Sequence, residues 1–163
     1  MAPNLHTDLE KVYDEYSDML YRIALTHTAD QHDAMDVVQD VFVKYATVKK
    51  KFDNALHEKA WLIRVTVNRA HDLSRKNKVR SYTPLDEVYD LPDEENNLSL
   101  AVREMLESLP EKYKTVLVLH YFEGFSVEET AGILDISVSA VKMRLLRARE
   151  VLNVSHKPED FYE

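Results

Sequence analysis

Apolar residues recur at helical spacing along most of this chain, and few residues in the sequence can interrupt them. The chain has only two glycines and five prolines among its 163 residues. Because turn-rich β folds need many more residues of these two kinds, their scarcity favours an all-α protein. The hydrophobic fraction of 45% is large enough for a buried core, and the length is compatible with one or two compact domains.

Three helices are predicted in the first half of the chain. The first covers residues 5–27 and the second covers 31–48, each with one apolar face. The stretch 50–58 breaks this pattern and is predicted to be a loop. The third helix covers 59–78, where an almost wholly apolar start is followed by a basic end. The residues expected to be buried on the second helix are Val37, Val38, Val41, Phe42 and Tyr45.

The second half of the chain begins with a change of composition. Residues 81–97 contain six acids, two prolines and no base, which predicts a flexible acidic linker. A helix is predicted over 98–108, and another starts at Pro110 and ends at Gly124, since proline is favoured in a first helical turn.

The residues after Gly124 predict a helix-turn-helix. Ser126 and Glu129 match the S-x-x-E capping box that opens a helix, and Ser137 can cap the last helix after a short corner. The inward stripe of this last helix is expected to be Val141, Leu145, Ala148 and Leu152. Its opposite face then presents basic side chains that can reach guanine edges or phosphates in the major groove. A helical hairpin with a solvated basic face is the alternative for this segment alone.

The formal net charge of −8 conceals a segregation of charge along the chain. Residues 1–40 contain nine acids and two bases, whereas residues 44–80 contain eleven bases and three acids. The chain has no cysteine, which excludes disulfides and thiolate metal sites. We expect no metal, no cofactor and no enzymatic activity, because no nucleophile or glycine-rich loop accompanies the titratable residues. The acidic N-terminus and the lack of a membrane-length apolar run predict a cytoplasmic protein without membrane insertion.

Four motifs occur in a characteristic order, and together they carry a resemblance. They are DAMDVVQDVF (33–42), WLIRVTVNRAHD (61–72), LP (109–110) with its following helix, and VKMRLLRAR (141–149). The ordered set resembles the sigma-70 family of RNA polymerase sigma factors, in its small extracytoplasmic-function group. The resemblance implies an alternative-type sigma factor with two small helical domains, 1–80 and 98–163, joined by the linker 81–97. The second domain ends in the helix-turn-helix.

The resemblance also implies three binding surfaces. The residues implied to dock on the clamp helices of the polymerase β′ subunit are Asp33, Asp36, Gln39, Asp40 and Phe42. The residues implied to bind and open the −10 promoter element are Asn54, His57, Lys59, Trp61, Asn68, Arg69, Asp72, Arg75 and Lys76. The residues implied to read the −35 element are Ser137, Ser139, Lys142, Met143, Arg144, Leu146 and Arg147. Trp61 is also expected to anchor the hydrophobic core of its domain.

The implied partners are core RNA polymerase, promoter DNA and an anti-sigma factor. Met143 and Ala140 depart from the family pattern, which leaves the base preference of the last helix open. Two other functions remain as alternatives. One is a sigma mimic that sequesters an anti-sigma factor without touching DNA, and the other is a helix-turn-helix repressor. The basic residues on both DNA-facing helices disfavour the mimic, and a repressor would need a dimer interface or an effector pocket.

Overall fold

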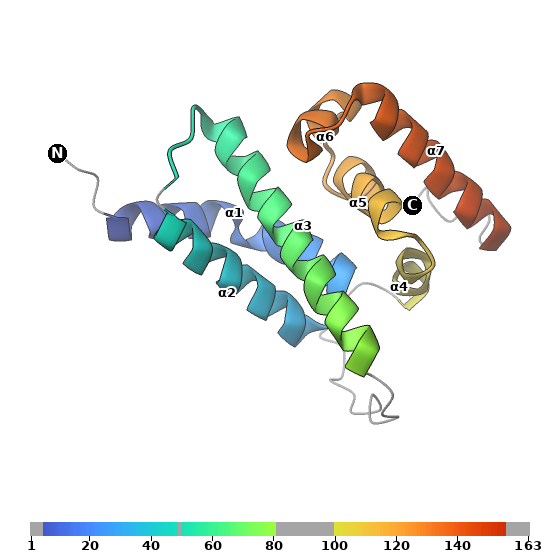
Figure 1. Ribbon diagram of the computed structural model, residues 1–163, viewed down its shortest axis with the longest axis horizontal. Coiled ribbons are helices and arrows are strands. Elements are labelled where there is room, and N and C mark those ends of the chain that lie inside the picture. Colours follow the sequence, from blue (N-terminus) through green and yellow to red (C-terminus); the bar gives the residue numbers. More distant parts are fainter. Residues whose placement is uncertain (1–4, 49, 81–99, 156–163) are drawn as a thin grey trace.

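The structure is a computed structural model that describes residues 5–48, 50–80 and 100–155, with side chains for 8–48, 50–76 and 100–153. The expected linker, 81–97, lies outside the described residues. The described secondary structure is entirely helical, which confirms the predicted all-α class (Figure 1). In chain order the elements are α1 (Leu5–Thr28), α2 (Gln31–Val48), α3 (Ala55–Arg80), α4 (Leu100–Glu107), α5 (Glu111–Leu117), the π-helix η1 (Val118–Phe122), α6 (Val127–Leu134) and α7 (Val138–Ser155).

Helices α1, α2 and α3 pack together as the first helical group. Their apolar stripes meet in its interior, where Leu20, Ile23, Val37, Val41, Leu62 and Ile63 have no exposed surface. The bounds of α2 agree with the prediction, and α1 ends one residue later than predicted. Trp61 is buried, as expected of a core anchor. Tyr45 is only partly buried, so the predicted stripe on α2 is confirmed for four of its five residues.

The predicted loop over 50–58 is wrong at its C-terminal end. Helix α3 begins at Ala55, four residues earlier than the predicted start at residue 59. The reason is local, because Asn54 caps the helix. Its side-chain Oδ1 accepts a hydrogen bond from the His57 N–H at 2.8 Å, and its carbonyl accepts one from the Glu58 N–H at 3.2 Å.

The segment that precedes the helix-turn-helix is helical as predicted, but it is not one regular helix. Pro110 is the N-cap of α5, and the chain passes into η1 at Val118. Gly124 then adopts a φ of 79°, a left-handed conformation that costs glycine little. The sequence contains no signal from which the change to π-helical geometry could have been predicted.

The helix-turn-helix has the predicted construction. Both hydrogen bonds of the capping box between Ser126 and Glu129 are present at 3.0 Å. Asp135 turns the corner in a left-handed conformation, with a φ of 56°. The Ser137 hydroxyl then accepts a hydrogen bond from the Ala140 N–H at 3.0 Å. The four residues predicted to face inward on α7 are all buried, so its opposite face is free to contact a ligand.

The two helical groups lie against each other, with α3 beside α6 (Figure 1). Buried residues of both groups belong to one continuous apolar cluster, from Leu20 and Ile23 in α1 to Phe125 and Ile133 near α6. A second, smaller cluster holds the helix-turn-helix together and consists of Val116, Ala131, Val141 and Leu145. Helix α7 belongs to both clusters, with Val141 and Leu145 in the smaller one and Ala148 and Leu152 in the larger one.

Candidate nucleic-acid and polymerase-binding surfaces

Aromatic rings gather where α2, the following loop and the start of α3 meet. The centroid of the Phe52 ring lies 6.1 Å from that of Tyr45, 5.7 Å from that of Trp61 and 5.4 Å from that of His57. The Tyr45 hydroxyl donates a hydrogen bond to Glu58 Oε2 at 2.9 Å. Burial and the Glu58 carboxylate raise the pKa of Tyr45 to about 12, so the hydroxyl stays protonated at physiological pH. We call Tyr45, Phe52, His57 and Trp61 the aromatic cluster.

The predicted −10 residues form two groups along α3 and do not converge on one point. Asn54, His57 and Lys59 lie at its start beside the aromatic cluster. The second group lies further along the helix, where Asn68, Asp72, Arg75 and Lys76 are exposed and Arg69 is partly exposed. Positions 54 and 76 are separated by about 33 Å along a helix axis, at 1.5 Å per residue. That length suits an extended strand of several nucleotides better than a single base.

Two members of the aromatic cluster, Tyr45 and Phe52, were missed by the sequence analysis. The available signal was the occurrence of aromatic residues before, within and after the predicted loop, at 45, 52 and 61. Stacking of a base on an aromatic side chain contributes about 1–3 kcal/mol to single-strand binding. Phe52 is partly buried beside these residues, and the resemblance alone did not imply it.

The predicted polymerase-binding residues lie on α2. Asp36, Gln39 and Asp40 are exposed and Asp33 is partly exposed, as a docking surface requires. Phe42 is different, since only 6% of it is exposed and its ring packs 4.9 Å from the ring of Tyr13. This burial agrees with the expectation that Phe42 belongs to the inward stripe of α2, and its part in polymerase docking stays a prediction.

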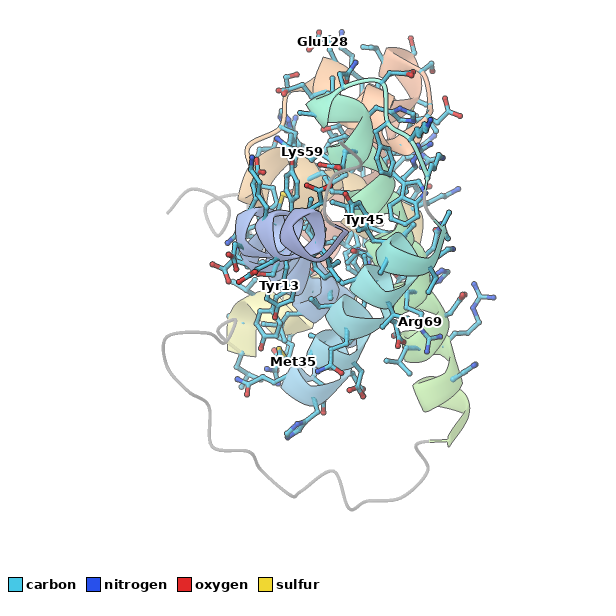
Figure 2. All side chains as sticks on the ribbon, turned by 90° about the vertical axis from the view of Figure 1, so that its left-hand side faces the viewer. Tyr13, Met35, Tyr45, Lys59, Arg69 and Glu128 are labelled. Atoms are coloured by element: carbon cyan, nitrogen blue, oxygen red, sulfur yellow. The ribbon has the colours of Figure 1, made fainter. Side chains whose placement is uncertain are left out.

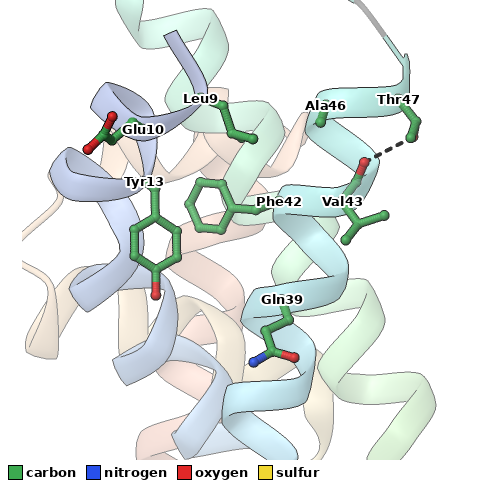
Figure 3. Close-up of a pocket in the computed structure, with 8 residues that line it drawn as sticks. All are labelled: Leu9, Glu10, Tyr13, Gln39, Phe42, Val43, Ala46 and Thr47. Carbon is green, nitrogen blue, oxygen red and sulfur yellow. Dashed lines mark hydrogen bonds between the residues drawn. The ribbon is translucent and has the colours of Figure 1, made fainter. Parts of the chain in front are cut away.

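An apolar groove adjoins this acidic face. It has a volume of about 770 Å³ and is lined by Leu9, Glu10, Tyr13, Gln39, Phe42, Val43, Ala46 and Thr47 (Figure 3). Phe42 forms part of its floor, and Val43 is 62% exposed beside it. A partner helix that reaches Asp36 or Asp40 with a basic side chain can thus place an apolar side chain in the groove.

An ion pair joins the α2 face to α3. The Arg69 Nε donates a hydrogen bond to Asp40 Oδ2 at 2.8 Å, with the two side chains 39% and 49% exposed. Asp40 belongs to the predicted polymerase face, and Arg69 belongs to the predicted −10 residues. The charge of each is therefore partly neutralised by the other in this structure.

The predicted −35 residues lie along α7, except for Ser137, which directly precedes its first residue. Those that are exposed are Ser137, Ser139, Lys142, Met143, Leu146 and Arg147, whereas Arg144 is partly buried. Ser137 already uses its hydroxyl as a helix cap. Arg147 pairs with Glu150 at 3.0 Å, and Arg149 is held by the hydroxyl and ring of Tyr121. Arg147 can leave its exposed partner at little cost, since surface ion pairs contribute about 0–1 kcal/mol.

Other kinds of site were sought among the described residues. They contain no helix long and apolar enough to cross a membrane. In the same part of the chain, no group of three or more histidine or acidic side chains is arranged to hold a metal ion.

Comparisons with known proteins give the same assignment for both helical groups. Residues 12–80 match the family model for sigma-70 region 2, and residues 99–152 match that for sigma-70, region 4. RNA polymerase sigma factor SigV of Bacillus subtilis is 29% identical over 148 residues, which cover 90% of this chain and 89% of SigV. ECF RNA polymerase sigma factor SigW of the same species is 30% identical over 163 residues, covering 86% of this chain and 84% of SigW.

Solved structures have the same fold. CnrH, in complex with the cytosolic domain of CnrY, superposes with a TM-score of 0.70 at 27% identity, covering 94% of this chain and 89% of CnrH. The sigma factor RpoE of Bartonella quintana, in complex with the anti-sigma factor NepR, gives a TM-score of 0.66 at 24% identity, covering 89% of this chain and 94% of RpoE.

A basic helix-turn-helix beside a three-helix bundle with an acidic outer face defines a helical, DNA-binding class of transcription protein. Within that class the chain belongs to the sigma-70 family of RNA polymerase sigma factors, in its extracytoplasmic-function group.

Proposed function

We propose that this chain binds core RNA polymerase and directs it to promoters by recognising their −10 and −35 elements. In this proposal residues 1–80 bind the polymerase and the −10 element, the acidic linker is 81–97, and residues 98–163 read the −35 element. The observation that carries the proposal is the presence, in one chain, of an acidic docking face on α2 and basic surfaces on α3 and α7.

The polymerase would dock on α2. Asp33, Asp36 and Asp40 offer carboxylates to a basic partner surface, with Gln39 beside them, and the neighbouring groove supplies apolar area. This pairing of charge with a desolvated apolar anchor is typical of specific protein interfaces. The partner in this assignment is the pair of clamp helices of the β′ subunit.

The −10 element would bind along α3. The aromatic cluster supplies a stacking surface, and Asn54, His57 and Lys59 supply polar groups beside it. Arg75 and Lys76 are exposed and suited to phosphates of the same strand. Extruding a base costs a few kcal/mol of lost stacking, which these contacts must offset.

The −35 element would be read by the exposed face of α7 in the major groove. Lys142 and Arg147 are the basic residues at its centre, and Met143 and Leu146 can contact thymine methyl groups. The phosphates beside the groove would meet Ser139 and the backbone N–H groups at the start of α7.

Several further assignments belong to the same proposal. The chain acts by binding and has no catalytic activity of its own, and it works in the cytoplasm, where the polymerase is found. RpoE of Bartonella quintana was solved with an anti-sigma factor, and this likeness supports an anti-sigma partner here.

Run-off transcription tests the proposal. Host core polymerase is incubated with a library of genomic fragments, with and without the chain, and the transcripts are sequenced. Discrete start sites that require the chain are the expected result. If the chain binds the polymerase but yields no chain-dependent start sites, the function is not promoter selection. If the free chain binds duplex DNA tightly and lowers transcription, it is a repressor.

A further inference from the structure

Two apolar residues lie on the outward face of α7. Its inward stripe consists of buried residues, which are Val141, Leu145, Ala148 and Leu152. At about 100° of rotation per residue, Met143 lies about 190° from the middle of that stripe, so it is directed away from the protein interior. Leu146 lies about 60° to one side of Met143 by the same rotation. Met143 is 51% exposed and Leu146 is 47% exposed, and we call these two residues the apolar pair.

Basic side chains lie on both sides of the apolar pair. Lys142 and Arg144 are about 100° to either side of Met143 by the same rotation. Lys142 is exposed and Arg144 is partly buried. An α-helix fits into the major groove of DNA, where the phosphates line the two edges and the bases form the floor. This surface therefore complements duplex DNA, with cations toward the edges of the groove and apolar side chains toward its floor.

The other two arginines of α7 are already engaged within the protein. Arg147 Nη1 donates a hydrogen bond to Glu150 Oε2 at 3.0 Å. Arg149 donates a hydrogen bond to the hydroxyl of Tyr121 and lies over its ring. Each arginine has to leave or share its partner before it can hydrogen-bond a base edge. Contact by the apolar pair displaces only water, so it needs less rearrangement than a contact by either arginine.

The apolar group that the major groove presents is the methyl group at C5 of thymine. The methyl group of 5-methylcytosine occupies the same ring position on the other pyrimidine. Residues 143 and 146 are about 4.5 Å apart along the helix axis, which is close to the spacing of about 3.4 Å between successive base pairs. The spacing of the apolar pair thus matches methyl groups on neighbouring base pairs.

We propose that the apolar pair of α7 recognises the C5-methyl groups of pyrimidines in the −35 element, so that cytosine methylation at the contacted positions strengthens binding. Thymine supplies the methyl group in unmodified DNA, and 5-methylcytosine supplies it where a cytosine stands. This inference rests on the proposed function for the identity of the −35 element, but methyl recognition is measurable with the chain and duplex DNA alone.

The apolar pair belongs to a different helical group from the predicted polymerase face on α2. Figure 2 shows Glu128, in the first turn of α6 of the same helix-turn-helix, at the top of the molecule, and Met35 of α2 in its lower half. Substitutions at the apolar pair leave the residues of the polymerase face unchanged. Loss of DNA binding can therefore be measured apart from loss of polymerase binding.

A selection experiment identifies the duplex to be tested. The full chain is incubated at low salt with a pool of random-sequence duplexes, and the bound duplexes are recovered and sequenced over several rounds. Low salt is used because affinity for DNA falls steeply as the salt concentration rises. The most enriched duplex is then synthesised with each thymine replaced in turn by uracil, which removes only the methyl group.

Fluorescence anisotropy then measures the affinity of the full chain for each duplex. Uracil should weaken binding about four-fold at each position that the apolar pair contacts, a factor that corresponds to about 0.8 kcal/mol for one buried carbon group. At the same positions a C·G pair should also bind more weakly than the T·A pair. Replacing that cytosine by 5-methylcytosine should restore affinity by about the same four-fold factor.

Alanine substitutions test whether the apolar pair is responsible. Met143→Ala and Leu146→Ala should each abolish the difference between thymine and uracil at one position and keep it at the other, because alanine lacks the atoms that contact the methyl group. Leu100→Ala on α4 is the matched control, since Leu100 is 68% exposed and lies outside the predicted −35 residues. It should keep the full difference at both positions. The circular dichroism spectrum checks that each variant remains helical.

The proposal is overturned if no sequence is enriched, if uracil duplexes bind as tightly as thymine duplexes at every position, or if the difference survives both alanine substitutions. It is also overturned if the alanine substitutions weaken polymerase binding and leave duplex binding unchanged, since the apolar pair is then a protein-contact surface. A failed run-off assay would count against the proposed function and would leave the duplex measurements valid. Normal run-off transcription without a methyl effect would overturn this inference alone.

Discussion

Removing the charge of Asp40 should change two activities in opposite directions. Asp40 accepts a hydrogen bond from Arg69 at 2.8 Å, and both side chains are close to half exposed. Exposed ion pairs of this kind contribute about 0.2–1 kcal/mol, which corresponds to a factor of about 1.4 to 5 in an equilibrium constant. Asp40→Asn should therefore raise the affinity of the free chain for single-stranded DNA by about that factor, while it weakens polymerase binding.

Asp36→Asn is the matched control for this prediction. Asp36 is exposed on the same helix, one turn before Asp40, and its neutralisation changes the net charge by the same amount. It should weaken polymerase binding but raise DNA affinity less than Asp40→Asn does. Fluorescence anisotropy with a labelled single-stranded oligonucleotide measures the affinity for DNA. Titration of the labelled chain with core polymerase measures the affinity for polymerase.

A double-mutant comparison isolates the ion pair. In an Arg69→Ala background, Asp40→Asn and Asp36→Asn should have equal effects on DNA binding, because no arginine remains to be released. Equal gains from the two asparagine variants in the wild-type background would refute the reasoning. The reasoning would also be refuted if Asp40→Asn still raised DNA affinity more than Asp36→Asn in the Arg69→Ala background.

Three further predictions concern recognition of the −35 element, opening of the promoter duplex and the effect of pH. Arg147→Ala should weaken use of promoters that depend on the −35 element by about 1–3 kcal/mol. Lys76→Ala should weaken all promoters similarly and should reduce the slope of log affinity against log salt concentration by about 1. Run-off assays at several salt concentrations would measure both effects. The Asn68→Ala variant should bind polymerase normally but open the promoter duplex slowly. If its unpaired thymines react with permanganate as in the wild type, Asn68 has no role in opening. Burial lowers the pKa of His27, whose Nδ1 lies 2.7 Å from Glu111 Oε2, below its ordinary value of 6.5. The free energy of unfolding should therefore fall as pH drops below 6.5, because the unfolded chain binds the proton that the buried ring excludes. Glu111, with a pKa lowered from 4.5 to about 2, should add to this loss only below pH 4.5. Thermal denaturation followed by circular dichroism should show a loss of stability that begins near pH 6.5, and a flat profile down to pH 5 would contradict the His27 contribution.

Local signals in the sequence were sufficient for most of the helices. The stripe of apolar residues on α2 predicted its bounds, because helix periodicity is set by residues three and four positions apart. The capping box predicted the start of α6, because Ser126 and Glu129 lie only three positions apart and bond to each other's backbone N–H groups. The Asn54 cap was equally local and was overlooked, so the late predicted start of α3 was an avoidable error.

The candidate surfaces were only partly predictable. The exposed face of α7 followed from its buried stripe, since the two faces of one helix determine each other. The burial of Phe42 followed from the apolar stripe of α2, but no pattern within α2 reveals its contact with the ring of Tyr13 in α1. The aromatic cluster was missed for a similar reason, since it combines residues of α2, the loop and α3.

The sequence by itself determined the helical class, the helix-turn-helix and the family, because each depends on short-range spacing or on the order of motifs. Only the tertiary structure decided which charges are already paired. Arg22 Nη2 lies 2.9 Å from Glu123 Oε1, 101 positions away, and His27 Nδ1 lies 2.7 Å from Glu111 Oε2, 84 positions away. Whether such residues meet depends on how the shared apolar cluster packs one helical group on the other. Packing of that kind is a property of whole surfaces in contact, and periodicity within a single helix carries no information about it.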